Sequence, residues 1–275
     1  MKKIFITGAS SYVAKPTINY LKKKNQLILN FRKKKIINKK KNISNIDFSK
    51  EFNLNFDFNY LLHFASLTPN TKKKKSYYSD NVSGFKNLLL KLKKCKKIFL
   101  LSAISVYANN KRQIINEKSK IEIKKSYGAS KYKMEKILIN YCRKKRVKFL
   151  ILRSPGIYDK NFIAKNFITR LCKSIKERQK IKISNLKKKF NNATNPQTIL
   201  KFIKKFLFSQ KLDDQIYNLC SKSITLENLI NLLEKKYNTK AIIKKFNSKK
   251  YFLISEKKLN KYDIKIPTIG KIINE

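Results

Sequence analysis

Tyr127 and Lys131 form the pair of side chains best suited to proton transfer. On a helix, residues i and i+4 share a face, so a phenol and an ammonium group at this spacing can flank one substrate. A nearby cation stabilises the phenolate and lowers the tyrosine pKa from about 10 toward neutrality. The same spacing recurs elsewhere in this lysine-rich chain, at Tyr20/Lys24, Tyr132/Lys136 and Tyr141/Lys145. Two features favour Tyr127/Lys131 over the other three pairs. The residues between Tyr127 and Lys131 are the small Gly-Ala-Ser, and Tyr127 stands at the start of an expected helix.

A turn of small residues follows the first apolar run of the chain. Its sequence is Thr7-Gly8-Ala9-Ser10-Ser11-Tyr12-Val13-Ala14. Between a strand and a helix, such a turn directs backbone N–H groups and the positive end of the helix at a pyrophosphate. We therefore expect a dinucleotide to bind here, and the expected contacts are Gly8, Ser10, Ser11, Tyr12 and Val13.

The elements that must hold these residues alternate along the chain. Strand-like runs are Ile4–Thr7, Leu27–Phe31, Tyr60–Phe64, Lys97–Leu101 and Lys148–Leu152, and helix-like stretches are Val13–Lys24, Val82–Lys94 and Tyr127–Arg143. The alternation predicts an α/β fold with a Rossmann-like, doubly wound parallel sheet. The pattern loosens beyond Gly156, which predicts a small C-terminal substrate-binding region. We expect a dinucleotide-binding domain over 1–160 and a mainly substrate-binding region over 161–275, with 212–230 returning to the sheet.

Several segments carry, in order, a resemblance to one family. They are Thr7–Ala14 (TGxxGxxG, with Ser11 and Ala14 at the later glycines), His63–Ser66 (HxAA), Asn81–Leu88 (NvxGTxNLL), Ser102–Tyr107 (SSxxVYG), Tyr127–Lys131 (YxxxK), Leu152–Asp159 (LRpxxvYGp), Phe190–Thr198 (FxNxVHVDDL) and Tyr217–Ser221 (YNlgs). The series resembles the extended short-chain dehydrogenases/reductases, NAD(P)-dependent epimerases, dehydratases and reductases of nucleotide sugars. Glycine is kept where the backbone needs it, and four of the five glycines, Gly8, Gly84, Gly128 and Gly156, stand at glycine positions of the family.

The resemblance implies catalytic roles. Tyr127 would be the acid/base for a sugar oxygen, and Lys131 would lower its pKa and bind the nicotinamide ribose. The family carries a serine or threonine, which hydrogen-bonds the substrate oxygen and the tyrosine, where this chain has Ala103. Ser105 has the same strand parity as Ala103, so it is the expected third catalytic residue.

The resemblance also implies the cofactor contacts. Besides the turn, Tyr127 and Lys131, the expected contacts are Asn30, Arg32, Asp47, Phe48, Phe64, Ala65, Ser66, Asn81, Ser102, Pro155 and Ile157. An acid at the end of the second strand binds the ribose 2′-OH of NAD, and an arginine there accepts the 2′-phosphate of NADP. Because Arg32 and Lys33–Lys35 are positive, the sequence leans toward NADP over NAD.

The composition of the chain bears on other possible partners, on metal binding and on localisation. The net charge of +51 would suit a polyanion or an anionic membrane, but lysines are spread over the whole chain and Lys, Asn and Ile are enriched together. This favours compositional drift, so we expect no dedicated nucleic-acid site and no membrane association. The four cysteines, Cys95, Cys142, Cys172 and Cys220, form no CxxC pair, and there is one histidine, His63, so no metal site is expected. Reduced thiols and the absence of a long apolar run predict a cytoplasmic protein.

Two alternatives to the enzyme stay open. Ala103, Ser11 and Gln197 depart from the family pattern, which would suit a catalytically eroded NAD(P)-binding sensor or scaffold. A polyanion binder driven by charge is the other. The family also pairs through two long helices, so a homodimer through Val82–Lys94 and Tyr127–Arg143 is expected from the resemblance, although the high charge opposes self-association.

Overall fold

The computed structural model describes residues 1–32, 43–69, 77–107, 114–121, 127–161, 164, 166–209, 212–245, 252–262 and 264–274. The chain divides into two compact units. Unit 1 comprises Met1–Asn109, Ile121–Arg153 and Pro196–Ile216, and unit 2 comprises Asn110–Lys120, Ser154–Asn195 and Tyr217–Glu275.

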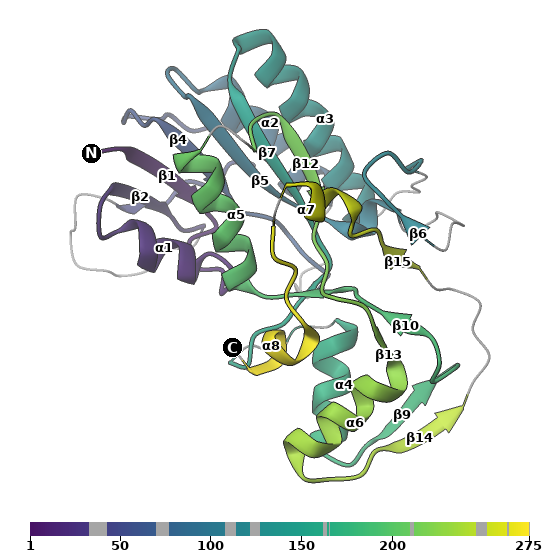
Figure 1. Cartoon of the computed structure of the whole chain (residues 1–275). Helices are drawn as coiled ribbons and strands as arrows, with labels where there is room; N and C mark the ends of the chain where they lie inside the picture. Colours follow the sequence, from purple (N-terminus) through teal and green to yellow (C-terminus); the bar gives the residue numbers. More distant parts are fainter. Residues whose placement is uncertain are drawn as a thin grey trace. The chain divides into compact units, whose positions relative to one another are not determined.

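A seven-stranded sheet of order β12-β7-β5-β4-β1-β2-β3 forms the centre of unit 1 (Figure 1). Its strands are β1 (Lys3–Thr7), β2 (Gln26–Asn30), β3 (Ile43–Ser44), β4 (Tyr60–His63), β5 (Lys97–Ala103), β7 (Lys148–Ser154) and β12 (Gln215–Asn218), of which β7 and β12 end in residues of unit 2. The neighbouring pairs from β5 to β3 are parallel. The order reverses at β1, which has β2 on one side and β4 on the other. In open α/β sheets, a ligand crevice lies at such a switch point, outside the carboxyl ends of the strands.

Helices cover both faces of this sheet, as Figure 1 shows. The helical segments of unit 1 are α1 (Lys15–Leu21), η1 (Tyr78–Ser83), α2 (Gly84–Leu90), η2 (Ile104–Tyr107), α3 (Tyr127–Lys145) and α5 (Pro196–Phe208). α1 packs with α5, and α2 packs with α3. The arrangement confirms the predicted Rossmann-like, doubly wound α/β fold.

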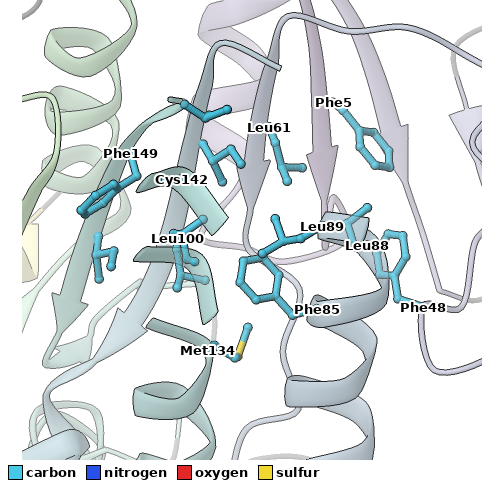
Figure 2. Close-up of a cluster of buried hydrophobic side chains, with 14 of the residues drawn as sticks. Phe5, Phe48, Leu61, Phe85, Leu88, Leu89, Leu100, Met134, Cys142 and Phe149 are labelled. Atoms are coloured by element: carbon cyan, nitrogen blue, oxygen red, sulfur yellow. The ribbon is translucent and has the colours of Figure 1, made fainter. Parts of the chain in front are cut away.

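The core between the sheet and the helices α2 and α3 is apolar and aromatic (Figure 2). Phe5, Leu61 and Leu100 on the strands meet Phe85 on α2 and Met134 on α3, and each is at most 1% exposed. Burying such side chains stabilises a fold by about 1.5–3 kcal/mol each relative to exposure. This packing holds α2 and α3 against the sheet.

The helix predicted over residues 82–94 differs from the one observed. The segment begins earlier, as the π-helical η1, and α2 then runs only from Gly84 to Leu90. Short π-helical turns often occur at functional sites, and η1 contains Asn81, one of the predicted site residues.

Unit 2 holds short strands and helices around a core of its own. Its elements are β6 (Ile114–Ile115), β8 (Gly156–Ile157), α4 (Phe167–Lys176), β9 (Lys180–Ile183), β10 (Lys189–Phe190), β11 (Ala193–Thr194), β13 (Ile224–Thr225), α6 (Leu226–Tyr237), β14 (Ile242–Lys245), β15 (Leu253–Ile254), α7 (Lys257–Lys261) and α8 (Ile269–Asn274). α4 and α6 pack together over residues such as Ile168, Leu171 and Leu229. Among the described residues of the whole chain, no helix has the length and apolarity to cross a membrane.

Candidate active site

The turn after β1 is built on Gly8. Gly8 has a φ of +69°, and a Cβ there would lie 2.6 Å from the Ala65 amide nitrogen. A residue with a side chain would therefore be strained by its conformation and would clash with the backbone after β4. The Phe64 N–H donates to the Thr7 carbonyl at 3.1 Å, which joins the carboxyl ends of β1 and β4 at the switch point.

The rest of the turn is held by its own hydrogen bonds. The Ser11 N–H donates to the Gly8 carbonyl at 2.9 Å, and the Ser11 Oγ accepts from the Val13 N–H at 3.3 Å. Ser11 thus engages one of the amides expected to face a pyrophosphate. Ser10 is exposed, Tyr12 is half-buried and Val13 is buried.

The Asn30 side chain holds the backbone of its own unit together. Its Oδ1 accepts from the Ile46 N–H at 2.8 Å and from the Ser44 hydroxyl at 3.0 Å, and its Nδ2 donates to the Ile46 carbonyl at 3.1 Å. Asn30 is 2% exposed. The Asn30 amide therefore holds β3 and the residues after it against the end of β2. The sequence predicted a cofactor contact at Asn30 and did not predict this structural role.

Two carboxylates engage Arg32. Its Nε lies 3.3 Å from Asp47 Oδ2, and its Nη2 pairs with Asp80. The pKa of Asp47 is lowered: burial acts against this, but hydrogen bonds from Ser49 and the Arg32 charge outweigh it. The cluster has one positive and two negative groups, so the arginine on which an NADP preference depends is already neutralised. Lys33–Lys35, the other basic residues of that argument, lie outside the described residues.

The predicted contacts Phe48 and Phe64 have buried aromatic side chains. Phe48 packs edge-on against Phe52 at 5.3 Å between ring centres, and Phe64 packs against Phe99 at 5.3 Å. Only their backbones are therefore left to meet a ligand.

Asn81 joins the loop after β4 to the first turn of α3. Its Oδ1 accepts from the Leu67 N–H at 2.7 Å, and its Nδ2 donates to the Leu67 carbonyl at 3.1 Å and to the Ser130 Oγ at 3.2 Å. Ser130 in turn donates to the Tyr127 carbonyl at 2.7 Å. One amide thus fixes the predicted residue Ser66 and its neighbour Leu67 relative to Tyr127.

Tyr127 and Lys131 lie on one face of α3. The Lys131 Nζ is 5.9 Å from the centre of the Tyr127 ring and donates to the Leu101 carbonyl at 2.8 Å. Lys131 is 2% exposed, and burial lowers its pKa to about 7, while the negative Glu135 raises it.

The phenol of Tyr127 is held in its neutral form. Burial raises the pKa of Tyr127 well above 10; a hydrogen bond with the Ser66 side chain lowers it, and the nearby Tyr77 and Tyr12 raise it. The Tyr77 ring stands edge-on to Tyr127 at 5.7 Å.

Ser102 belongs to a buried polar network that motif reasoning missed. Its hydroxyl donates to Glu135, which forms an ion pair with Arg153 at 2.7 Å; Arg153 also donates to the Tyr107 hydroxyl. None of these four side chains is more than 3% exposed. The available signal was the position of Glu135, one helical turn beyond Lys131, in a chain with only 16 acids.

Ser105 lies on η2, against the start of α3. A Cβ on Gly128 would lie 2.2 Å from the Ser105 carbonyl oxygen, so only glycine allows this approach. The Ser105 Oγ is buried without a hydrogen-bond partner among the described residues. Ala103, at the end of β5, is 8% exposed.

Pro155 and Ile157 belong to unit 2. Pro155 is buried and its carbonyl accepts from the Ser154 hydroxyl at 3.2 Å, while the Ile157 carbonyl accepts from the Asn166 side chain at 2.9 Å. The other predicted site residues belong to unit 1.

His63 has a structural contact. A hydrogen bond of 2.8 Å joins its Nδ1 to the Thr7 hydroxyl. Burial, aided by the charge of Lys131, lowers the pKa of His63 to about 3, so the ring is neutral at physiological pH. Within the part of the chain that is described, no cluster of His, Cys, Asp and Glu could hold a metal ion.

Comparison with known proteins gives one family and one fold. Residues 4–191 match the model of the family described as "NAD dependent epimerase/dehydratase family". Among curated proteins, no sequence match was found.

Similar solved structures share the fold at low sequence identity. UDP-glucuronic acid 4-epimerase from Bacillus cereus, solved with UDP-glucuronic acid and NAD, is 18% identical with a TM-score of 0.75, covering 98% of this chain and 95% of that chain. dTDP-glucose 4,6-dehydratase from Bacillus anthracis, solved with NAD, is 14% identical with a TM-score of 0.74, covering 98% and 94%. A short-chain dehydrogenase/reductase superfamily protein from Agrobacterium tumefaciens, solved with NAD, is 13% identical with a TM-score of 0.79, covering 99% and 95%.

Proposed function

Because the chain belongs to the NAD dependent epimerase/dehydratase family, we propose that it is an enzyme that uses a nicotinamide dinucleotide to transform a nucleoside-diphosphate sugar. The observation that supports this most is the pair formed by the half-buried Tyr127 and the buried Lys131 on one face of α3. The backbone after β4, which approaches the Gly8 turn at Ala65, leads to Ser66 beside this pair. The similar structures were solved with NAD, and two of them are a nucleotide-sugar epimerase and a dehydratase.

The residues around the switch point fit a dinucleotide. Gly8 leaves no side chain between β1 and the backbone after β4, and the amides of the turn would hold the pyrophosphate. When bound, the nicotinamide ring would supply the oxidation and reduction chemistry at a sugar carbon.

The chain's own residues would move the proton. Tyr127 would exchange it with a sugar hydroxyl or carbonyl through its phenol oxygen. In the free protein, burial favours the neutral forms of both Tyr127 and Lys131. An anionic dinucleotide beside Lys131 would favour its ammonium form, and that charge would in turn favour the phenolate.

We propose NAD rather than NADP as the cofactor. The lean toward NADP rested on Arg32, and this guanidinium pairs with Asp47 and Asp80. Among the described residues, a 2′-phosphate at Arg32 would have to approach one guanidinium and two carboxylates. Calorimetric titration should give tighter binding of NAD than of NADP, and Asp80→Asn should narrow the difference. Tighter binding of NADP by the unchanged protein would contradict the proposal.

The function can be tested with a ligand panel. Melting temperatures are measured with NAD, with NADP, and with UDP-, GDP- and dTDP-sugars in the presence of the dinucleotide. A ligand that binds only the folded state raises the melting temperature by mass action. NMR of the sugar products then identifies epimerisation, dehydration or reduction. The proposal fails if no dinucleotide and no nucleotide sugar raises the melting temperature.

The second candidate function is a dinucleotide-binding protein that has lost catalysis. Ala103 favours it, because the family pattern has a catalytic serine or threonine at this position. Replacing Ala103 by Ser distinguishes a weakened enzyme from a protein that only binds the dinucleotide. Higher turnover in the variant would indicate eroded catalysis, whereas unchanged inactivity with full dinucleotide affinity would favour a sensor or scaffold.

A cytoplasmic location and a homodimer through α2 and α3 stay predictions. Sedimentation at high salt would test the dimer.

A further inference from the structure

Proton transfer by Tyr127 depends on how its ring is oriented, and position 103 offers no hydroxyl to hold it. Position 103, which carries serine or threonine in the family pattern, is Ala103 here. An alanine methyl forms no hydrogen bond with a phenol oxygen. The packing of the Tyr127 ring therefore has a larger part in setting its orientation.

An aromatic ring from another segment of unit 1 packs against Tyr127. The centre of the Tyr77 ring lies 5.7 Å from the centre of the Tyr127 ring, and the two ring planes meet at 61°. Aromatic pairs prefer such an edge-to-face arrangement, because the positive edge of one ring meets the negative face of the other. The Lys131 ammonium lies 5.9 Å from the same Tyr127 ring. The ring thus has one contact from its own helix and one from the residue that precedes η1.

The segment that follows Tyr77 is anchored on two sides. Asp80 on η1 pairs with Arg32, which follows β2. The Asn81 amide holds both backbone groups of Leu67, at 2.7 Å and 3.1 Å, and also bonds a side chain in the first turn of α3. η1 also packs against α3 along its length. Tyr77 is therefore presented to Tyr127 from a fixed support.

Two successive tyrosines at this place have different environments. Tyr77 is half-buried, whereas Tyr78, the first residue of η1, is 61% exposed. Only the ring of Tyr77 packs edge-on against Tyr127 among the described ring pairs of these two residues. Tyr78 therefore offers a matched control, with the same side chain one position away.

We propose that Tyr77 is a positioning residue for Tyr127, whose ring holds the phenol in the orientation from which it meets the substrate. The consequence for turnover rests on the proposed function, whereas the contact between the two rings does not. An aromatic pair is worth enough to favour one orientation about 2- to 10-fold, and this sets the size of the effects expected below.

The contact is tested by following the Tyr127 ring itself. A fluorinated tyrosine is introduced at position 127 alone in the full chain, and its fluorine resonance, which depends on the packing around the ring, is recorded by NMR. Tyr77→Leu removes the neighbouring ring and should move the resonance toward its position in the unfolded chain. Tyr77→Phe keeps the ring and should stay near the unchanged protein. Tyr78→Leu should leave the resonance where it is.

Three results would overturn the proposal. The first is a resonance that Tyr77→Leu leaves unchanged. The second is an equal displacement in Tyr78→Leu, which would indicate a general loosening of η1. The third is Tyr77→Phe behaving like Tyr77→Leu, which would assign the contact to the hydroxyl and not to the ring. Urea unfolding curves check that the variants are folded, and Tyr77→Met offers a second way to remove the ring.

Turnover provides an independent readout. Tyr77→Leu should lower kcat about 2- to 10-fold with little change in KM, Tyr77→Phe should retain kcat, and Tyr78→Leu should have no effect. An unchanged kcat in Tyr77→Leu, together with a displaced resonance, would refute the positioning role. If the unchanged protein turns over no nucleotide sugar but Tyr77→Leu still displaces the resonance, the proposed function fails and the contact between the rings stands.

Discussion

At the scale of single residues, the site depends on how the charge of one phenol is controlled. Burial holds Tyr127 neutral, and Ser66 and Lys131 are the neighbours that can favour its ionised form. Lys131 is itself buried, so its charge depends on what binds beside it. An anionic ligand beside Lys131 would favour its ammonium form, whose charge would in turn favour the phenolate of Tyr127.

Replacing Tyr127 by Phe tests the acid/base role. Loss of a positioned proton donor lowers turnover by about 10²–10⁴-fold, whereas affinity for the dinucleotide should change little. The matched control is Tyr132→Phe, because Tyr132 and Lys136 have the same spacing on the same helix, with 5.8 Å between ammonium and ring. Turnover is measured with the nucleotide sugar that raises the melting temperature. Equal loss in the two variants would contradict the assignment.

His63 should make the stability depend on pH. Its pKa is about 3 in the folded protein and 6.5 ordinarily, so between these values the unfolded chain binds more protons. Stability should therefore fall as the pH decreases from 6.5 toward 3. In His63→Gln, which cannot titrate, the slope should be smaller by up to about 1.4 kcal/mol per pH unit. Urea unfolding across this range measures it, and parallel curves for the two proteins would refute the prediction.

Site residues whose partners lie close to them in the sequence could be predicted. The turn at Gly8 and the pair Tyr127 and Lys131 are readable because spacing along the chain sets their geometry. It did not find the partners of Arg32, since Asp80 lies far along the chain and only folding brings the two together. For the same reason, Asn30 looked like a ribose contact although its amide is engaged by Ile46 and the neighbouring residues of β3.

At the scale of elements, a buried ion pair joins helix α3 to strand β7. Arg153 Nε and Nη2 donate to the two carboxylate oxygens of Glu135 at 3.1 Å and 2.7 Å. Ser102 on β5 and Tyr107 on η2 complete the network. The network thus links β5, η2, α3 and β7, and its Glu135 lies one helical turn after Lys131 on α3.

Removing one charge of the Glu135–Arg153 ion pair should lower the free energy of unfolding more than removing both charges. Glu135→Met leaves the Arg153 charge buried without its partner, which costs about 3–5 kcal/mol in such cases. The double variant Glu135→Met/Arg153→Met removes both charges, so its loss should be smaller. Free energies of unfolding in urea give the comparison. A double variant as unstable as the sum of the single variants would show that the two charges do not act together.

Element types were predictable and their boundaries were less so. The strand expected over Lys97–Leu101 continues to Ala103, and the expected helix from Val82 is preceded and shortened by η1. Such limits are set by tertiary contacts, as when Asn81 on η1 clamps Leu67, and these contacts leave no local signal in the sequence.

At the scale of the whole molecule, the charge of +51 acts against the compact state. Like charges repel one another more strongly in the folded chain than in the expanded one. The described salt bridges involve few of the 67 basic residues, so most of this repulsion is left to be screened by ions.

Salt should therefore stabilise the protein. Between about 0.01 M and about 0.5 M salt the Debye length falls from about 30 Å to below 8 Å, which removes most long-range repulsion. Unfolding by urea, an uncharged denaturant, should show a rising free energy over this range, with sodium and potassium chloride giving the same increase. A flat or falling curve would mean that the lysines are already neutralised within the fold.

The proposed function requires that the Gly8 turn binds a nicotinamide dinucleotide. Calorimetric titration with NAD at high salt, where charge alone attracts few anions, tests it directly. We predict saturable binding at one site per chain, and loss of that binding in Gly8→Ala, whose Cβ would meet the Ala65 backbone at 2.6 Å. Heats that never saturate, or that are the same in the folded Gly8→Ala variant, would contradict the claim.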